Sequence, residues 1–377
     1  MTRATTTKTW LCLGLCGALA TMTGASPAFA AAPTAALNAS LTSPWSSAPS
    51  LSRTRAYHSA TRLTDGTVLV VGGQGWTSGP SSAAATATTE AYTPATNAWS
   101  ARASLATARQ GHTATLLNDG RVLVAGGQNT ATLASAELYD PATNTWSPTG
   151  SLATARRGHK AVLLNNGKVL VVGGFGAAAL KSAELYDPAT GAWTTTGSLA
   201  TVEGRLTATL LPDGRVLAIN DNGVTATAER FNPATGTWSG AAAPPAFYGH
   251  AAVLLPQGAV LAVGQEQGRF ESGAWLFWAE DNEWEYVSTA NESRRSGHTL
   301  TLLDDGRVLV ARGTRNQVGG SAELFSTTNW SLSVAGGDAP TTGHTATLLE
   351  DGRVLVVGGT SQEEPEIYSS AELFTAP

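Results

Sequence analysis

One segment of the chain, residues 156–193, carries a design that recurs along most of its length. It reads RRGHKAVLLNNGKVLVVGGFGAAALKSAELYDPATGAW, in which two short apolar runs flank an Asn-Gly pair. Asn-Gly between β-rich runs is a strong hairpin signal, because both turn positions tolerate a positive φ. A glycine doublet ends the second strand, SAELYDP forms a third strand that stops at Asp-Pro, and Trp193 opens a polar fourth strand that suits a sheet edge. The segment therefore predicts one four-stranded antiparallel sheet.

Two markers count the copies of this sheet. The glycine of the hairpin turn recurs seven times, 44 to 54 residues apart, and an aromatic residue of the third strand recurs as often. The glycines are Gly66, Gly120, Gly167, Gly214, Gly258, Gly306 and Gly352, and the aromatics are Tyr92, Tyr139, Tyr186, Phe231, Phe277, Phe325 and Phe374. Periods of this length are typical of units that cannot bury a face alone and must stack. Seven such sheets arranged radially predict an all-β fold, a seven-bladed β-propeller.

The repeat resembles that of the kelch family. The resemblance rests on the R-x-G-H start of the copies, the glycine doublet, the A-E-L-Y-D-P run and the tryptophan that follows, and it covers roughly residues 45–377. WD-repeat propellers also use Gly-His and Trp, but here each of these tryptophans is followed by Ser, Thr or Glu and never by Asp. Kelch is the better match, and it implies a propeller whose last blade is closed by a strand from the other end of the chain.

Trp45 predicts where that closure occurs. It precedes His58 by thirteen residues, the same distance that separates Trp146 from His159, so it belongs to a fourth strand. The chain stops at SSAELFTAP, just after a third strand, with no tryptophan to follow. We therefore expect the N-terminal strand to complete the last blade.

The first thirty residues have the pattern of a secretory signal peptide. Arg3 and Lys8 precede an apolar core over residues 10–22, which is too short to span a bilayer of about 30 Å, and an Ala-Phe-Ala site ends at Ala30. We expect cleavage near Ala30 and export to the medium, the periplasm or the cell surface. Residues 31–44 then form a flexible lead, because they are small, polar and uncharged, and residues 45–377 form the propeller.

The composition of the exported chain narrows its partners. Removal of Arg3 and Lys8 leaves 21 basic residues against 28 acidic ones, a net charge near −7 that argues against nucleic acid. No later segment is apolar for long enough to span a membrane. Over 300 residues of repeating sheet bury enough apolar surface to fold without disulfides, and we expect a monomer.

The resemblance also raises an enzyme alternative, since the central domain of galactose oxidase and its glyoxal oxidase relatives is a seven-bladed kelch propeller. Those copper enzymes use a tyrosine cross-linked to a cysteine, a second tyrosine and two histidines. Both cysteines of this chain, Cys12 and Cys16, lie within the predicted signal peptide, so the exported chain could not form that cofactor. We expect no cofactor.

Residues at repeated positions are interpreted as scaffold. The six histidines all occupy one repeat position, and a repeated position spreads its members around a ring instead of converging on a metal ion, so we expect no metal site. The recurring glutamates of the third strand are assigned a pairing role within the blade, and the recurring tryptophans a packing role. The histidines are His58, His112, His159, His250, His298 and His344, and the glutamates are Glu90, Glu137, Glu184, Glu229, Glu323 and Glu372.

Two groups of residues form the predicted ligand-binding set, both on the face that carries the variable loops after the second strands. Four arginines stand three residues before a histidine, where Glu203, Phe247 and Thr341 stand in other blades. In several kelch propellers arginines at this place bind carboxylates, to which a guanidinium presents a planar fork. Pairing of these arginines with the blade glutamates is the alternative. The predicted set is Arg55, Arg109, Arg156 and Arg295, then Asn220, Asp221, Glu266, Arg312 and Arg315 where blades 4–6 break the repeat, and Trp76 in the long loop of blade 1.

The pattern as a whole favours a binding module for a protein, peptide or glycan over an enzyme. The chain has no G-x-S-x-G elbow, no H-E-x-x-H and no phosphate loop. A carbohydrate-active or lyase-type enzyme stays open, because its paired carboxylates leave no motif, and Glu203, Asp221 and Glu266 are the candidates. A purely structural surface protein is the third possibility.

Overall fold

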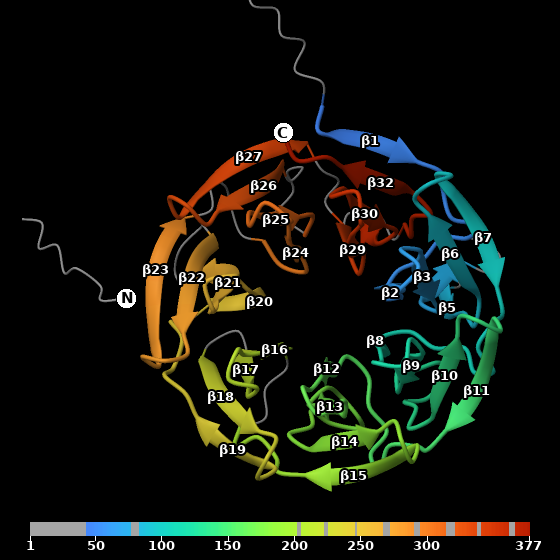
Figure 1. Ribbon diagram of the computed structural model, residues 1–377, viewed down its shortest axis with the longest axis horizontal. Helices are drawn as coiled ribbons and strands as arrows, with labels where there is room; N and C mark the ends of the chain where they lie inside the picture. The colour runs from blue at the N-terminus through green and yellow to red at the C-terminus, as the bar shows by residue number, and fades with distance from the viewer. Residues whose placement is uncertain are drawn as a thin grey trace, which may run out of the picture. The chain divides into compact units, whose positions relative to one another are not determined.

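Seven four-stranded antiparallel sheets stand around a central axis, as Figure 1 shows. The structure is a computed structural model, and it describes residues 43–76, 83–201, 205–221, 225–245, 247–266, 272–289, 295–313, 321–337, 341–361 and 366–377. The segment from Ser43 to Pro377 is one unit. The prediction of an all-β, seven-bladed propeller is confirmed. The predicted signal peptide and almost all of the lead lie outside the described residues.

The strands of each blade run outward from the axis in chain order. Blades 1–3 consist of β2 (Ser59–Arg62), β3 (Val68–Val71), β6 (Thr89–Thr93) and β7 (Ala98–Arg102); β8 (Thr113–Leu116), β9 (Val122–Ala125), β10 (Ala136–Asp140) and β11 (Thr145–Thr149); and β12 (Lys160–Leu163), β13 (Val169–Val172), β14 (Ala183–Asp187) and β15 (Ala192–Thr196). Blades 4–6 consist of β16 (Arg205–Leu210), β17 (Val216–Asp221), β18 (Ala226–Asn232) and β19 (Thr237–Gly240); β20 (Phe247–Leu254), β21 (Ala259–Glu266), β22 (Ser272–Trp278) and β23 (Glu283–Thr289); and β24 (Thr299–Leu302), β25 (Val308–Ala311), β26 (Ser321–Ser326) and β27 (Ser331–Gly337).

Blade 7 joins the two ends of the chain. It consists of β29 (Thr345–Leu348), β30 (Val354–Val357), β32 (Ala371–Phe374) and β1 (Trp45–Ala48). Strand β1 pairs with β32 in antiparallel register, Trp45 opposite Phe374, with the two ring centroids 5.1 Å apart. The predicted closure of the last blade by an N-terminal strand is therefore confirmed (Figure 1).

Two small two-stranded sheets accompany blades 1 and 7. In blade 1, β4 (Gln74–Trp76) pairs with β5 (Ala83–Ala85). At blade 7, β28 (Thr341–Thr342) pairs with β31 (Thr360–Ser361). Both belong to the blades whose long second-strand loops the sequence singled out.

The core lies between the blades, and it explains why the second strands are continuously apolar. Val68 and Val70 of β3 pack with Leu355 of blade 7, whereas the alternate residues of β3 pack with valines of blade 2. Because side chains alternate across a strand, a strand between two blades is buried on both faces. Full burial of each such Val or Leu stabilises the fold by roughly 1.5–3 kcal/mol.

The outer strands are tied to the preceding blade by their tryptophans. The indole Nε1–H of Trp146 donates to the Ala103 carbonyl at 2.8 Å, and that of Trp193 donates to Gly150 at 2.8 Å. Each indole also lies against the third-strand aromatic of its own blade, as in the Tyr139–Trp146 pair with centroids 5.0 Å apart. The repeated tryptophans thus pack the blades, as predicted.

Candidate functional site

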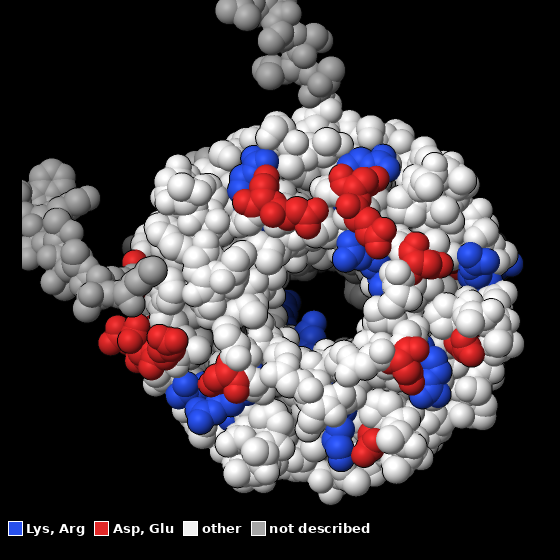
Figure 2. All heavy atoms as spheres, viewed as in Figure 1, with Lys and Arg blue, Asp and Glu red and all other residues white. Residues whose placement is uncertain are grey.

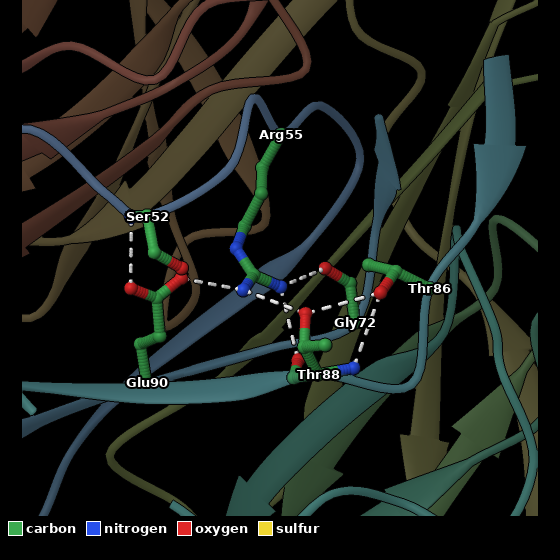
Figure 3. A network of polar contacts seen from close by, with 6 residues as sticks. All are labelled: Ser52, Arg55, Gly72, Thr86, Thr88 and Glu90. Atoms are coloured by element: carbon green, nitrogen blue, oxygen red, sulfur yellow. Dashed lines mark hydrogen bonds and ion pairs between the residues drawn. The ribbon is translucent and has the colours of Figure 1, made fainter. Parts of the chain in front are cut away.

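Arg55 is part of a buried polar network that holds blade 1 together (Figure 3). One terminal nitrogen, Nη2, lies 2.7 Å from the Glu90 carboxylate, and the other, Nη1, donates to the Gly72 carbonyl at 2.8 Å. Both nitrogens also bond Thr88, and Glu90 accepts the backbone N–H of Ser52. The side chain of Arg55 is 0% exposed, so its guanidinium serves the blade and does not face solvent.

Three other blades repeat this arrangement. The arginine-to-glutamate distances are 2.8 Å for Arg109–Glu137, 2.8 Å for Arg156–Glu184 and 3.3 Å for Arg295–Glu323, with every arginine side chain at most 1% exposed. Burial lowers the pKa of Arg109 and Arg156, and the hydrogen bond and charge of the paired glutamate oppose that shift. Of the two interpretations of these arginines, the geometry favours pairing within the blade. The glutamates have the pairing role that the sequence predicts.

Blade 7 receives its arginine from blade 6. Arg312 ends the second strand of blade 6, yet its Nη2 lies 2.8 Å from Glu372 of blade 7 and its Nη1 donates to the Gly358 carbonyl at 2.7 Å. Arg312 has a φ of +57°, which glycine normally occupies at this place. Thr341 stands where an arginine would otherwise fill the space, and it bonds Arg312 Nη1 at 3.1 Å. Arg312 is therefore scaffold supplied from the neighbouring blade.

Blades 4 and 5 depart from this arrangement in different ways. In blade 5 Phe247 and Trp275 take the places of arginine and glutamate, and their rings pack with centroids 5.9 Å apart. In blade 4 Asn220 and Asp221 replace the glycine doublet, and both are 1% exposed. Strand β17 there stays in regular register to its end, with Asp221 opposite Arg205. Asn220 and Asp221, like the arginines, do not reach the surface.

The histidines form a belt that links neighbouring blades around the channel. His112 Nε2 bonds the Ser59 hydroxyl at 2.9 Å, and His159 Nε2 bonds the Thr113 hydroxyl at 2.9 Å. The same contact with the preceding blade recurs for His58, His250 and His344. In blade 5 Ala251 stands in place of the hydroxyl residue, so His298 Nε2 of blade 6 bonds the Val263 carbonyl at 3.1 Å instead. The repeated histidines are scaffold, as predicted.

Burial favours the neutral form of five of these imidazoles, because it lowers their pKa. It lowers the pKa of His58, His112, His159 and His298 to about 3, with the nearby arginines acting in the same direction. The His250 side chain is also buried, and within the described part of the chain it is the one belt histidine with a carboxylate contact, with Nδ1 2.9 Å from Asp221 Oδ2.

The belt is interrupted between blades 3 and 4. Lys160 follows His159 at the place where Ser or Thr stands in most other blades, and Leu206 replaces the histidine that would bond it. The two substitutions compensate one another, because with Leu206 in blade 4 there is no imidazole that needs a hydroxyl partner from blade 3. The change releases Lys160 from the belt and exposes it at the channel wall.

A second ring, formed by the residue before each histidine and before Leu206 of blade 4, lines the mouth of the channel. Five of its members are glycines, and the other two are Tyr57 and Arg205. The glycines are Gly111, Gly158, Gly249, Gly297 and Gly343, with φ values from +61° to +71°. Backbone hydrogen bonds between blades run from Tyr57 N to Gly343 O at 2.8 Å, from Gly111 N to Tyr57 O at 3.0 Å and from Gly158 N to Gly111 O at 2.8 Å.

Tyr57 and Arg205 adopt different backbones at this ring. Tyr57 keeps the left-handed conformation with a φ of +55°, which costs of order 1–3 kcal/mol in a residue other than glycine. Its ring lies against Gly343, where an added Cβ would be 3.0 Å from Tyr57 Cδ1, and it stays 43% exposed. Arg205 instead begins strand β16, and its Nη1 reaches within 3.1 Å of where a Cβ of Gly249 would lie.

These departures from the repeat meet in one cavity of about 370 Å³ at the channel mouth. Its walls include Tyr57, Lys160 and Arg205, with the hydroxyl residues Ser296 and Thr342 on the side of blades 6 and 7. Figure 2 shows an open hole at the centre of the ring, with Lys or Arg atoms in its wall. No carboxylate of the described residues forms an ion pair with Lys160 or Arg205. Among the described residues, the cavity therefore carries two cations without an acidic partner.

Lys160 is in an unusual environment for a lysine. Its side chain is open to the channel, yet protein atoms surround it closely enough that desolvation lowers the pKa of its ammonium group. An anion in the cavity would offset this cost, because an opposite charge favours the charged form of an amine.

Of the remaining predicted residues, Trp76 and Glu266 are not among those that line this cavity. Trp76 is half-buried in β4, where its backbone N–H donates to the Thr54 hydroxyl at 3.2 Å, and Glu266 is half-buried at the end of β21. Arg315 and Glu203 fall outside the described residues. The structure thus does not bring the predicted set together as one exposed site.

A larger cavity of about 570 Å³ lies between blades 2 and 3 at the opposite ends of their inner strands. Arg121 and Lys168 line it, and both are paired, with Asp119 at 2.6 Å and Asp187 at 3.1 Å. Similar grooves of about 390 Å³ and 260 Å³ lie between blades 4 and 5 and between blades 1 and 7. Because the groove repeats and its charges are neutralised, we regard it as part of the scaffold.

The residues of the channel cavity were missed by sequence reasoning, although the signal was present. Lys160 breaks the Ser/Thr position after the histidine, and Tyr57 and Arg205 break the glycine position before it. Comparison of the copies at those two positions would have found all three. The arginine and glycine-doublet positions, on which most of the predicted set rests, contain none of these three residues.

A copper site of the galactose oxidase kind does not fit these residues. Each blade except blade 4 contributes one histidine to the belt, and within the described part of the chain no three His, Cys, Asp or Glu side chains cluster as metal ligands would. Both cysteines precede Ser43. The same part of the chain has no helix of the length and apolarity needed to cross a bilayer.

Comparison with known proteins places the fold. The family model of the Kelch motif matches residues 111–153 and 156–200, which correspond to blades 2 and 3. A solved structure of a fungal alcohol oxidase of the AA5 family, in complex with copper, is similar over 88% of this chain and 76% of its own, with a TM-score of 0.68 and 17% identity. No curated protein matches the chain by sequence. At this identity the likeness concerns the fold alone: the chain folds as a seven-bladed β-propeller, and blades 2 and 3 match the Kelch motif.

Proposed function

We propose that this propeller is an exported binding module that takes the carboxylate of a protein, peptide or glycan ligand at the mouth of its channel. The kelch propeller fold supports a binding or interaction module in general terms. The observation that carries the finer proposal is that Lys160 and Arg205 line one open cavity of about 370 Å³ and have no acidic partner among the described residues.

The chemistry of the cavity suits such a ligand. A hydrogen bond between a charged donor and a carboxylate contributes about 1.5–3 kcal/mol, more than a neutral one. Tyr57 offers an apolar ring surface beside the cations, and the hydroxyls of Ser296 and Thr342 can bond polar groups of the ligand. A few polar groups beside an apolar wall are typical of ligand sites.

The repeated arginines do not support this role. Arg55, Arg109 and Arg156 are fully buried and each pairs with a glutamate of its own blade. A ligand could reach them only by displacing that glutamate, which would leave a buried carboxylate unpaired at a cost of several kcal/mol.

An array of glycans and peptides, with and without carboxylates, tests the proposal when probed with the exported protein. We expect binding to a subset of the carboxylate-bearing ligands and not to their neutral counterparts. Lys160→Gln combined with Arg205→Gln should remove that binding. The matched control, Arg121→Gln with Lys168→Gln, removes two basic residues from the groove between blades 2 and 3 and should bind like the parent.

Two results would count against the proposal. One is equal binding to neutral and carboxylate-bearing members of a pair. The other is unchanged binding by a folded Lys160→Gln, Arg205→Gln variant. The array separates glycan ligands from peptide ligands, because each kind is represented in both charged and neutral form.

Catalysis at the channel wall is a second candidate, favoured by one contact. Thr207 Oγ1 lies 3.0 Å from His250 Nε2, and His250 Nδ1 lies 2.9 Å from Asp221 Oδ2, the order of contacts of a hydroxyl–histidine–carboxylate triad. The other hydroxyl–histidine pairs of the belt lack this carboxylate contact. Hydrolysis of an activated ester that disappears with both Thr207→Val and Asp221→Asn would support this candidate, and equal loss with Thr113→Val would show a general structural effect.

A further inference from the structure

Lys160 differs from the other lysines of the chain in position and surroundings. The chain has four lysines, Lys8, Lys160, Lys168 and Lys181, of which the structure describes the last three. Lys168 is paired with Asp187 at 3.1 Å, and Lys181 lies exposed before β14. Of the three described lysines, Lys160 alone lines the channel cavity.

The neighbours of Lys160 leave its amine free to react. Leu206, 9% exposed, replaces the imidazole that bonds the equivalent hydroxyl in most other blades. The adjacent residue of the belt, His159, is 3% exposed and bonds Thr113 of blade 2. Nothing in the described part of the chain gives the Lys160 amine an acidic partner that would hold it as an ammonium ion.

We propose that Lys160 is a carbonyl-reactive amine, so that the channel mouth captures oxo acids, ligands with an aldehyde or ketone near a carboxylate, as a Schiff base. The carboxylate half of this inference rests on the proposed function, because it assigns the acid group to Arg205. The carbonyl half rests on Lys160 alone. Lysines in partly desolvated pockets are the ones that form Schiff bases in proteins, since desolvation favours the neutral amine.

The reaction needs no further reagent. The Nζ lone pair attacks the carbonyl carbon and forms the C–N bond, and the C–O bond then breaks. The carbonyl oxygen leaves as water, which carries both hydrogens of the neutral amine, and a C=N bond remains. Nothing is oxidised or reduced, and hydrolysis reverses the step. Desolvation lowers the pKa of Lys160, which makes more of the reactive neutral form present at neutral pH.

Reductive labelling with glyoxylate, an aldehyde that carries a carboxylate, tests this inference on the exported protein. Glyoxylate and cyanoborohydride are added at neutral pH, and the modified lysines are counted by peptide mass spectrometry. We expect labelling at Lys160 to exceed that at Lys168 and Lys181 several-fold, because Lys160 lines the cavity without an acidic partner among the described residues and desolvation raises the neutral fraction of its amine. Equal labelling of the three lysines would overturn the inference.

Two variants separate this inference from the proposed function. Arg205→Gln should reduce labelling of Lys160 by glyoxylate several-fold and leave labelling by propanal, which has no carboxylate, unchanged. An equal loss with both aldehydes would contradict the assignment of the acid group to Arg205. Lys160→Arg keeps the positive charge but cannot form an imine. It should therefore still bind carboxylate ligands on the array, and glyoxylate should no longer block that binding by attaching covalently to residue 160. If this variant loses array binding while the parent still shows selective labelling of Lys160, the proposed function is contradicted and the Schiff-base inference is not.

Discussion

Arg312 of blade 6 pairs with Glu372 of blade 7 at 2.8 Å, and so fills the place that an arginine of the blade itself fills in blades 1–3 and 6. The exchange is possible because Thr341 is short and because Arg312 adopts the φ of a glycine, +57°. The ion pair therefore crosses from one blade to the next, close to where the N-terminal strand closes the ring.

The Arg312–Glu372 pair predicts a rescue by a second substitution. Arg312→Gly restores the glycine doublet but leaves Glu372 without its guanidinium, so we expect a lower melting temperature. The loss should be smaller than the 3–5 kcal/mol typical of a broken buried pair, because the Glu372 side chain is 37% exposed. Adding Thr341→Arg should recover most of the stability, since it rebuilds the arrangement of blades 1–3. If the double variant melts no higher than Arg312→Gly alone, the two arginine positions are not equivalent.

The buried arginines of the repeat predict a stability effect and no selective loss of binding. Arg109→Ala leaves Glu137 buried and without its cation, and should lower the free energy of unfolding by about 3–5 kcal/mol. Arg121→Ala removes an exposed arginine that is paired with Asp119 and should cost about 0–1 kcal/mol. Denaturant unfolding of the two variants checks this difference. An Arg109→Ala protein as stable as the parent would mean that this network does not support the blade.

Sequence reasoning predicted the architecture because the repeat itself imposes it. The hairpin glycines, the third-strand aromatics and Trp45 were enough to predict seven blades and the closing strand, since each marks a contact that every blade must make. The site was harder, because side-chain exposure at a repeated position depends on which neighbours fill the space. The sequence alone leaves open whether Arg109 binds a ligand or pairs with a blade glutamate, and in the fold it forms a buried pair with Glu137.

The blades that break the repeat show the same limit. Phe247 and Trp275 are substitutions far apart in sequence that compensate one another only in space, as do Lys160 and Leu206. Such compensating pairs cannot be recognised when the copies of the repeat are compared at one position at a time. Tyr57, Lys160 and Arg205 could have been found one by one, but that they share a cavity follows only from the closed ring.

The neutral histidines of the belt predict acid lability. Burial lowers the pKa of His112 and His159 to about 3 in the folded protein, whereas the unfolded chain takes up protons near pH 6.5. The unfolded state thus binds more protons below pH 6.5, so stability falls as the pH falls, by up to about 1.4 kcal/mol per pH unit for each buried histidine. Melting temperatures should therefore drop steadily from pH 6.5 to pH 5, above the range in which carboxylates titrate. A flat profile in that range would contradict the assignment of neutral histidines.

The closing strand predicts the effect of an N-terminal truncation. Deletion of residues 31–50 removes β1, whose Trp45 Nε1–H donates to the Ala335 carbonyl at 3.2 Å, and leaves the edge of β32 unpaired. We expect a lower melting temperature or aggregation. Deletion of residues 31–42 is the control, because it stops short of the strand, and it should melt like the parent. Equal melting temperatures for both deletions and the parent would mean that β1 does not hold the ring closed.

The central claim is that binding depends on the departures from the repeat at the channel mouth and not on its repeated charges. Isothermal titration of a carboxylate-bearing ligand found on the array tests it most directly, with the parent, the Lys160→Gln, Arg205→Gln variant and the Arg121→Gln, Lys168→Gln control. We predict a loss of about 1.5–3 kcal/mol for each charged contact removed in the first variant and no change in the second. Equal affinity of all three proteins, each with an unchanged melting temperature, would contradict the claim.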